Sequence, residues 1–346
     1  MLFPGYGEVA LVEKEVGDPG PGEVRLAMRA AGMCGSDLHF MHMSPEERRN
    51  PPWKGLEGDV SRTPGHEISG IVEAVGEGVT HLQVGSRVAI QHYSGCGFCR
   101  DCRMGWDTMC ANKTVYTLGR DGGFQDKLLA AAKDCLPIPD GMTYTTAAFI
   151  ACGAGTSFQA LRRSDLRAGG VIASVGLGPV GFSGLIWAKV GGAVTIGIDP
   201  LAARRDFSER FGADLTLDPA DPHLRDKIEE ISGYPGADAT LETAGNSAGR
   251  RLSMEILRPW GTSVWIGFGP GCELEAERHI IQNQATIRGS AVFGVSVMMD
   301  ALSYASTRDV DFDATITNTC SIEEGPAAIK EFEAGGYGKT FITWAD

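Results

Sequence analysis

The amino-acid sequence predicts an α/β protein built from a β-rich domain and a doubly wound parallel-sheet domain. The chain has 346 residues, which is enough for two domains that each bury a core. Short apolar runs separated by Gly- and Pro-containing turns fill the first part of the sequence. From Ala151 onward, apolar runs alternate with helical patterns, which is typical of β–α–β units in a parallel sheet.

The first part is expected to be an irregular sheet with long functional loops. Its short apolar or alternating runs have the length and pattern of strands. The polar segment 43–63 contains Pro45, Pro51 and Pro52, and we expect an exposed loop there, a candidate lid. The predicted strands are 23–31, 70–75 and 86–90.

The second part is expected to hold six short parallel strands with helices on both faces of the sheet. The residues from 293 onward lose the alternation and are expected to rejoin the β-rich domain. The predicted domains are therefore 1–152 together with 293–346, and 153–292. The predicted strands are 171–175, 194–198, 215–217, 239–242, 263–266 and 286–291, and the predicted helices are 181–190, 202–211, 222–231 and 247–257.

The charge balance limits the kinds of partner that the protein can have. The chain carries 31 basic and 44 acidic residues, a net charge of −13. Such a chain repels nucleic acid and anionic membranes. The first residues lack the basic and apolar regions of a signal peptide, and no continuous apolar segment is long enough for a transmembrane helix. We therefore expect a cytoplasmic protein with no nucleic-acid or membrane partner.

The nine cysteines are unevenly distributed, and four of them fall within the segment 95–111. In a reducing cytosol, clustered cysteines more often hold metal than form disulfides. Four thiolates close a tetrahedral shell about Zn²⁺ and leave no position for a substrate, so the metal would be structural. Two disulfides or four unrelated thiols are the alternative interpretations. The four residues are Cys96, Cys99, Cys102 and Cys110.

A glycine-rich motif, Gly176-Leu-Gly178-Pro-Val-Gly181, follows one predicted strand and opens a predicted helix. The next predicted strand ends in Asp199. This is the context of a dinucleotide-binding site in a Rossmann fold. Gly176 makes the tight turn, Gly178 allows the backbone to approach the pyrophosphate, and Gly181 permits close helix packing. The N-terminus of the helix then faces the phosphates.

Asp199 favours NAD over NADP as the cofactor. Its carboxylate accepts hydrogen bonds from the adenosine ribose and repels a 2′-phosphate. Arg204 and Arg205 follow closely and weaken this preference, so NADP stays as the alternative. A glycine turn at an ordinary strand–helix junction is the structural explanation of the same motif.

Three separate segments carry further candidate residues, although a lone Cys or His is usually a packed core residue. Together with the two motifs above and the closing Gly338-Lys339-Thr340, they resemble the zinc-dependent alcohol dehydrogenases of the medium-chain dehydrogenase/reductase superfamily. The resemblance covers essentially the whole chain and implies a GroES-like catalytic domain and a Rossmann NAD-binding domain. The three segments are Gly32-Met-Cys34-Gly-Ser36-Asp37-Leu-His39, Gly65-His66-Glu67 and Ala151-Cys152-Gly-Ala-Gly155-Thr156.

The resemblance implies a second, catalytic zinc ion, held by Cys34, His66 and Cys152, with a fourth position open for substrate. It places Glu67 beside the metal, and Asp37 on the other ring nitrogen of the zinc histidine. It also implies that Ser36 contacts the substrate oxygen, and that His39 is the solvent-side end of a proton relay. His42 matches no position of the family, and we interpret it as a loop residue.

The resemblance assigns three more residues to the cofactor. Val180 would pack against the nicotinamide ring, and Phe293 lies in a segment whose backbone binds the carboxamide. Lys339 would lie near the pyrophosphate. Core or surface positions are the structural alternatives for all three.

The function implied is the reversible oxidation of a secondary alcohol or a polyol- or cyclitol-type hydroxyl, with NAD as hydride acceptor and two zinc ions per chain. His92, near the expected substrate pocket, suits a hydroxylated substrate. The alternatives are a simple alcohol or aldehyde reductase that uses NADP(H), and a non-catalytic cofactor-binding protein on the same fold. A zinc-free quinone or enone reductase is disfavoured because such enzymes lack both cysteine sets. The family implies a homodimer or homotetramer.

Overall fold

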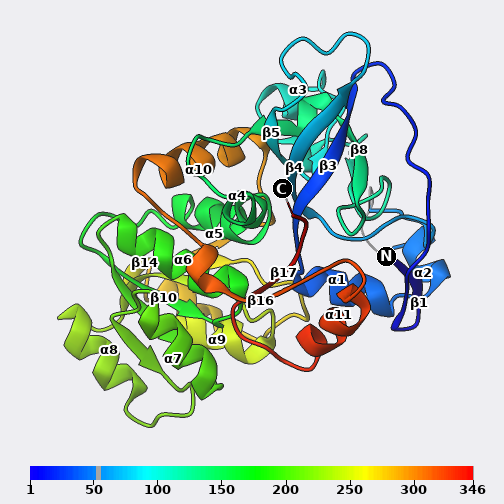
Figure 1. Cartoon of the computed structure of the whole chain (residues 1–346). Helices are drawn as coiled ribbons and strands as arrows, with labels where there is room; N and C mark the ends of the chain where they lie inside the picture. The colour runs from blue at the N-terminus through cyan, green and yellow to red at the C-terminus, as the bar shows by residue number, and fades with distance from the viewer. Residues whose placement is uncertain (52–55, 346) are drawn as a thin grey trace. The chain divides into compact units, whose positions relative to one another are not determined.

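The computed structural model describes residues 1–51 and 56–345. The chain forms two compact units, Met1–Gly155 with Phe293–Asp346, and Thr156–Val292 (Figure 1). The first break falls three residues after the one that the sequence predicts, and the return to the first unit falls at Phe293. Helix α5 (Gly153–Arg162) runs through the first break.

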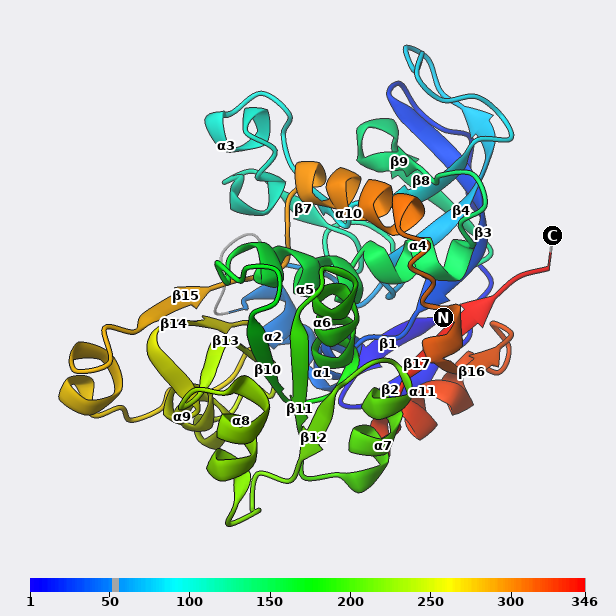
Figure 2. The same cartoon turned by 90° about the vertical axis from the view of Figure 1, so that its left-hand side faces the viewer.

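The second unit is a six-stranded parallel sheet in the order β12-β11-β10-β13-β14-β15, which Figure 2 shows from one edge strand to the other. This order reverses direction between β10 and β13, which creates a topological switch point. The strands are β10 (Val171–Val175), β11 (Val194–Ile198), β12 (Leu215–Leu217), β13 (Ala237–Glu242), β14 (Leu257–Trp265) and β15 (Thr286–Gly289).

Helices cover both faces of this sheet because successive side chains of a strand point to opposite faces. Val171, Ala173 and Val175 pack in one core cluster with α8 and α9, whereas Ile172 packs in another with α5 and α6. The helices are α6 (Pro179–Val190), α7 (Ala202–Arg210), α8 (Leu224–Ser232) and α9 (Ser247–Glu255). A short π-helical segment covers Glu277–Ile281.

The α/β fold class is confirmed, and the main error of the sequence prediction lies at the start of β14. The prediction begins that strand at residue 263, but β14 begins at Leu257, which pairs with Ala237. A register shift near this pairing accommodates the residues that follow, including Trp260 with a positive φ of 65°. The irregularity hides the strand from a periodicity argument, because alternation fails where a bulge inserts a residue.

The first unit contains a seven-stranded mixed sheet in the order β16-β17-β3-β4-β5-β9, with β8 paired to β3. Two small antiparallel pairs, β1 with β2 and β6 with β7, lie outside this sheet. The strands are β1 (Leu2–Gly5), β2 (Glu8–Ala10), β3 (Glu23–Gly32), β4 (Glu67–Val75), β5 (Arg87–Ile90), β6 (Tyr93–Ser94), β7 (Thr114–Val115), β8 (Lys127–Ala131), β9 (Cys135–Pro137), β16 (Ile316–Cys320) and β17 (Lys339–Thr343).

The helices of the first unit lie between its strands, and most of them are short. They are α1 (Gly35–His42), α2 (Pro45–Arg49), α3 (Arg100–Arg103), α4 (Tyr144–Ile150), α10 (Val295–Thr307) and α11 (Gly325–Glu333). Strand β17 joins β3 at the sheet centre, so the C-terminal segment completes the sheet that the N-terminal segment begins. No helix in the described chain combines the length and apolar character that a bilayer span requires.

The prediction of an exposed loop over 43–63 is wrong for part of that segment. Ser44 caps α2 by accepting a hydrogen bond from the Glu47 backbone N–H, and Pro45 starts the helix. Arg48 is 1% exposed, and its guanidinium donates to the Phe40 carbonyl at the end of α1. Residues 52–55 of the predicted loop lie outside the described residues.

Candidate metal centres and cofactor site

Three side chains from different parts of the first unit form a compact cluster of soft ligand atoms. The ligand atoms of Cys34, His66 and Cys152 all lie within 4.8 Å of one another. Cys34 precedes α1, His66 precedes β4, and Cys152 lies in the turn between α4 and α5. Two thiols and one imidazole are the donor set of a zinc site with an open fourth position, so the residues present fit such an ion.

Asp37 holds two of these ligands in place. Its Oδ1 lies 3.1 Å from His66 Nδ1, and its Oδ2 accepts a hydrogen bond of 2.9 Å from the Cys34 backbone N–H. Asp37 is fully buried. Burial alone would lower the pKa of His66, but Asp37 and the Cys34 thiolate raise it well above its ordinary value. Because Nδ1 faces the carboxylate, Nε2 is the nitrogen turned toward the ligand cluster.

Ser36 lies next to that nitrogen. Its Oγ is 3.1 Å from His66 Nε2, so the hydroxyl borders the position that a metal ligand would use. His39 follows three residues later on α1, and it is exposed. Residues spaced three apart share a face of a helix, so Ser36 and His39 lie on the same face of α1.

Lys339 is paired with Glu67 inside the first unit. The side chain is fully buried in the first unit, and its Nζ lies 2.7 Å from Glu67 Oε2 and 2.6 Å from the Met33 carbonyl. The Phe149 ring centroid is 4.9 Å from the same ammonium. The contacts with Glu67 and Met33 satisfy two of the three N–H donors of the ammonium within the first unit. In this structure the Lys339 ammonium is therefore the ion-pair partner of Glu67, and its assignment to cofactor binding stays a prediction.

Glu67 lies beside the three-ligand cluster, as the sequence analysis predicts, and it is fully buried. Burial raises its pKa to about 8, against the opposing effect of Lys339. Among the described residues, its Oε1 has no hydrogen-bond partner. An orphaned carboxylate oxygen next to two thiols is a further observation that fits a cation at this cluster.

His92 lies next to His66, one of the three candidate ligands. Its ring centroid is 5.2 Å from that of His66, and its Nδ1 donates a hydrogen bond of 2.9 Å to the Ala151 carbonyl. Burial lowers the pKa of His92 to about 3, so the ring is neutral. The proton therefore sits on Nδ1, and Nε2 is an acceptor. The sequence suggested a polar residue here, but only the fold assigns its tautomer.

The interpretation of His42 as a loop residue is wrong. His42 is the last residue of α1, and its Nε2 contacts the Glu333 carboxylate on α11. Gly7 lies against the same ring, because a Cβ at that position would meet His42 Cε1 at 3.0 Å. His42 therefore fastens the end of the helix that carries Ser36 and Asp37.

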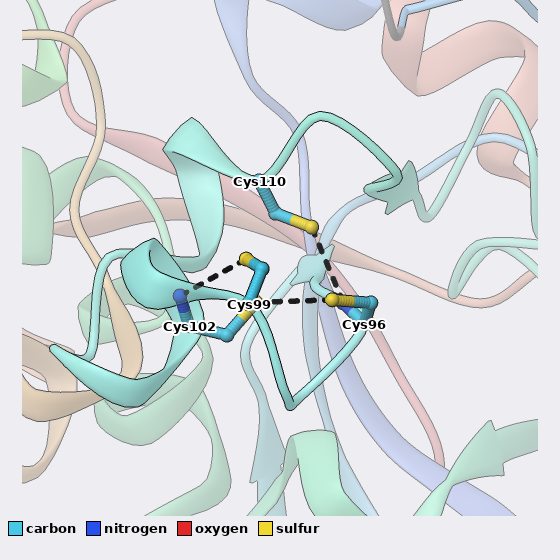
Figure 3. Close-up of side chains that lie close together, drawn as sticks. All are labelled: Cys96, Cys99, Cys102 and Cys110. Atoms are coloured by element: carbon cyan, nitrogen blue, oxygen red, sulfur yellow. Dashed lines mark hydrogen bonds between the residues drawn. The ribbon is translucent and has the colours of Figure 1, made fainter.

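The second cluster has four residues, and it lies on the lobe that contains α3. Figure 3 shows the side chains of Cys96, Cys99, Cys102 and Cys110 grouped together. Their sulfur atoms lie within 4.8 Å of one another, and every cysteine of the described chain is a free thiol. Backbone N–H groups of Phe98 and Cys99 lower the pKa of Cys96 to about 6. The arrangement excludes the disulfide interpretation for this structure and fits a structural zinc ion with four sulfur ligands.

The glycine-rich motif of the second unit connects β10 to α6. Gly176 has a φ of +95°, and a Cβ on Gly181 would meet the Gly176 carbonyl oxygen at 2.0 Å. A Cβ on Gly178, in contrast, would meet no described atom within 4 Å. Gly176 and Gly181 are therefore required by packing, whereas the space over Gly178 fits the approach of a ligand to the backbone. Val180 is partly buried at the start of α6 and packs against the core.

Asp199 follows β11 and lies beside the glycine loop. Its Oδ2 accepts a hydrogen bond of 2.9 Å from Leu177 N–H, and its Oδ1 accepts one of 2.9 Å from Leu201 N–H. A carboxylate oxygen accepts more than one hydrogen bond, so each can still bind a ribose hydroxyl. Arg204 lies 3.5 Å from Oδ2, whereas Arg205 donates to the Asp199 and Pro200 carbonyls.

Both halves of the chain match known families. The model of the alcohol dehydrogenase GroES-like domain matches residues 20–140, and that of the zinc-binding dehydrogenase matches residues 179–307. An uncharacterised zinc-type alcohol dehydrogenase-like protein of Escherichia coli strain K12 is 34% identical over 99% of this chain and 98% of its own length. The chain belongs to the zinc-dependent alcohol dehydrogenase family. An alcohol dehydrogenase of Geobacillus stearothermophilus is 32% identical, and each chain is covered to 82%.

The solved structures show the same fold for this member of the family. A protein of Sinorhizobium meliloti 1021 described as a zinc-binding dehydrogenase, solved with NADP, has a TM-score of 0.87. It is 26% identical, and the match covers 99% of this chain and 98% of the other. The predicted fold, a GroES-like part and a Rossmann part, is therefore confirmed.

Phe293 has a packing role in this dehydrogenase. The side chain is 1% exposed, its ring faces His92, and its carbonyl oxygen accepts a hydrogen bond of 2.7 Å from Gln91 Nε2. The carbonyl oxygen can accept a second hydrogen bond, so the predicted carboxamide contact stays a prediction.

The sequence analysis of this dehydrogenase also missed a buried pair in the second unit. Glu242 ends β13 and is fully buried, and the guanidinium of Arg250 on α9 faces it. A carboxylate that ends an apolar strand is the signal that would have found this pair, because a buried charge requires a partner.

Proposed function

We propose that this chain is an NAD-dependent, zinc-dependent dehydrogenase that reversibly oxidises a secondary alcohol or a polyol- or cyclitol-type hydroxyl. The observation that carries the proposal is the three-ligand cluster of Cys34, His66 and Cys152 with Ser36 Oγ 3.1 Å from the metal-facing ring nitrogen. Four-cysteine lobes and glycine loops occur in many proteins, but this arrangement adds a proton acceptor at the open side of a zinc site.

The chain supplies positioning and proton transfer, and the bound groups supply the rest. A zinc ion held by Cys34, His66 and Cys152 would lower the pKa of a hydroxyl bound to it, and a bound nicotinamide would supply the hydride acceptor. Ser36 Oγ accepts the hydroxyl proton as its own proton leaves toward His39, which passes a proton to solvent. Asp37 contacts His66 Nδ1 and keeps the ring oriented, so that His66 Nε2 would be the nitrogen that binds the metal.

His92 supports the hydroxylated substrate class. Nδ1 of the neutral imidazole donates to the Ala151 carbonyl, so Nε2 is the acceptor, and a purely apolar alcohol bound next to it would offer that acceptor no hydrogen bond. A second hydroxyl on the substrate would donate to this nitrogen. We therefore place polyols and cyclitols ahead of simple alcohols.

A second candidate, an alcohol or aldehyde reductase that uses NADP(H), is favoured by one observation. Arg204 lies beside Asp199 with a partly exposed side chain, and a cation there suits a 2′-phosphate. The Sinorhizobium meliloti protein solved with NADP is the reason to test NADP beside NAD. Asp199 still favours NAD, because its carboxylate lies between Arg204 and the loop.

A substrate panel with purified, zinc-quantified protein tests the proposal. Simple alcohols, diols, cyclitols and sugar alcohols are each offered with NAD and with NADP, and absorbance of the reduced cofactor is followed. We expect turnover with NAD that is abolished in Cys34→Ser and retained in the matched control Cys272→Ser. Turnover that persists in Cys34→Ser would refute the role of the cluster, and a clear preference for NADP would support the second candidate.

A further inference from the structure

In the second unit, the two loops at the carboxyl ends of β13 and β14 are joined by a buried ion pair. One loop, 243–246, follows β13, and the other, 266–271, follows β14. Glu242 Oε1 accepts a hydrogen bond of 2.8 Å from Gly245 N–H in the first loop, and Glu242 Oε2 lies 3.8 Å from Arg250 Nε.

Arg250 in turn holds the second loop by its backbone. Its guanidinium donates to the Gly267 carbonyl at 2.8 Å, to the Gly269 carbonyl at 3.4 Å and to the Pro270 carbonyl. The side chain is 9% exposed, and the Trp265 ring centroid is 5.6 Å from its Cζ. One planar cation thus satisfies three loop carbonyls from a rigid helix, which lysine cannot do with the same geometry.

The two loops also touch directly through glycines. A Cβ on Gly267 would meet Gly245 N at 2.3 Å, and a Cβ on Gly269 would meet the Gly245 carbonyl oxygen at 1.8 Å. Only glycine permits this approach of one backbone to the other. The loop 266–271 is therefore fastened twice, by backbone contact on one side and by Arg250 on the other.

The position of the loops relates them to the cofactor, and this step rests on the proposed function. A dinucleotide lies across the carboxyl ends of the strands at the switch point between β10 and β13. Asp199, after β11, marks the adenosine side. The nicotinamide half must then extend in the opposite direction, toward the loops that follow β13 and β14.

We propose that Arg250, oriented by Glu242, is a positioning residue that preforms the loop 266–271 for the nicotinamide half of NAD. When the loop is already ordered in the free protein, binding of the ligand does not carry the entropic cost of ordering it. Removing the guanidinium leaves three carbonyls without their donor, and the loop then samples other conformations. Arg250 itself needs no contact with the cofactor for this effect.

Calorimetric titration of the zinc-loaded protein with NAD and with ADP-ribose tests the proposal, because ADP-ribose lacks the nicotinamide ring. In Arg250→Ala we expect the Kd for NAD to rise about tenfold, as when the competent loop falls to about a tenth of the population. The Kd for ADP-ribose should stay unchanged. Arg250→Lys should recover part of the loss, and hydrogen exchange of 266–271 in the ligand-free protein should accelerate in Arg250→Ala.

Arg251→Ala is the matched control, because Arg251 is the next residue of α9 and pairs at the surface with Glu255 and Glu275. It should change neither affinity. Equal losses for both ligands in Arg250→Ala, or no loss for either, would overturn the positioning role. If Arg250→Ala does not fold, Arg250→Lys decides the matter by the same comparison. A wild-type protein that binds neither ligand would overturn the proposed function, whereas the hydrogen-exchange result would still report on the loop.

Discussion

Lys339 Nζ lies 2.7 Å from Glu67 Oε2, and both side chains are fully buried beside Cys34 and His66. The pair joins the start of β17 to the start of β4, so the C-terminal strand contributes a charge to a cluster formed by the N-terminal half. Ionisation of Glu67 or of either thiol would place negative charge in a buried site, where it is costly without a nearby cation. The ammonium reduces that charge without occupying the ligand position.

Replacing Lys339 by Met should destabilise the protein strongly. The change removes the ion-pair partner of the buried Glu67, and breaking a buried pair in this way costs about 3–5 kcal/mol of unfolding free energy. The double variant Glu67→Gln with Lys339→Met should recover much of the loss, because no charge is then left alone. Urea unfolding of the two single variants and the double variant measures the coupling. A Lys339→Met protein that is as stable as wild type but binds NAD weakly would favour the cofactor role that the resemblance implies over the ion-pair role.

Metal content should separate the two cysteine clusters. We expect two zinc ions per chain in the purified protein, measured by plasma mass spectrometry. Cys34→Ser should remove one ion and all activity, and Cys102→Ser should remove the other ion and lower the thermal midpoint. A single ion in the wild-type protein, or loss of both ions in Cys34→Ser, would contradict two independent sites.

Ser36 and His39 should affect turnover more than substrate binding. Ser36→Ala removes the proton acceptor next to His66 Nε2, and we expect kcat to fall about 100-fold with a smaller change in KM. Ser36→Thr keeps the hydroxyl and should retain much of the rate. His39→Ala should lower kcat less, because water can replace an exposed group. Steady-state kinetics measures both, and a Ser36→Ala enzyme with normal kcat would refute the relay.

His92 should decide between hydroxylated and apolar substrates. His92→Phe removes the acceptor nitrogen and keeps a ring of similar size between His66 and Tyr93. We expect kcat/KM for polyols to fall about tenfold or more, while that for simple secondary alcohols holds or rises. His42→Gln is the control, because His42 lies on the far end of α1 and pairs with Glu333. An equal loss for both substrate classes would show that His92 only supports the fold.

Asp214 should make the stability of the second unit depend on pH. Burial opposes ionisation of this carboxyl, but Lys189 and hydrogen bonds from Thr195 outweigh it and lower its pKa below the ordinary value of 3.8. The unfolded chain therefore takes up the proton first as pH falls. The stabilisation is complete well above pH 3.8 and disappears as pH falls through the lower, folded-state pKa.

Asp214→Asn should thus lose about 1 kcal/mol of unfolding free energy at pH 7, a modest value because the carboxylate is partly hydrated. The difference from wild type should shrink at pH values below 3.8. Denaturant unfolding over this pH range measures it. Asp226→Asn, at an exposed position of α8, should leave the stability unchanged. A constant difference between Asp214→Asn and wild type at every pH would refute the linkage.

The parts of the fold that follow local rules were predictable. The strands 171–175, 194–198 and 215–217 match β10, β11 and β12 residue by residue, because buried parallel strands are continuous apolar runs bounded by turns. β14 was misplaced because a register shift interrupts its pattern. The helix inside 43–63 was missed because its five residues are too few for periodicity, although the Ser-Pro-Glu-Glu start is a capping signature.

By itself the sequence determined the chemistry that short spacings encode: the four cysteines of one lobe, the glycine loop with Asp199, and, through resemblance, the ligands Cys34, His66 and Cys152. These features are local, or they are carried by motifs that keep their residues together. Tertiary structure alone decided that Lys339 neutralises Glu67, that His92 presents an acceptor nitrogen, and that Arg250 holds the loop after β14. Each of these depends on which distant backbone or charge a side chain meets once the chain is folded. The role of a buried polar group depends on the group it pairs with, and a pattern along the chain cannot predict a partner that is distant in sequence.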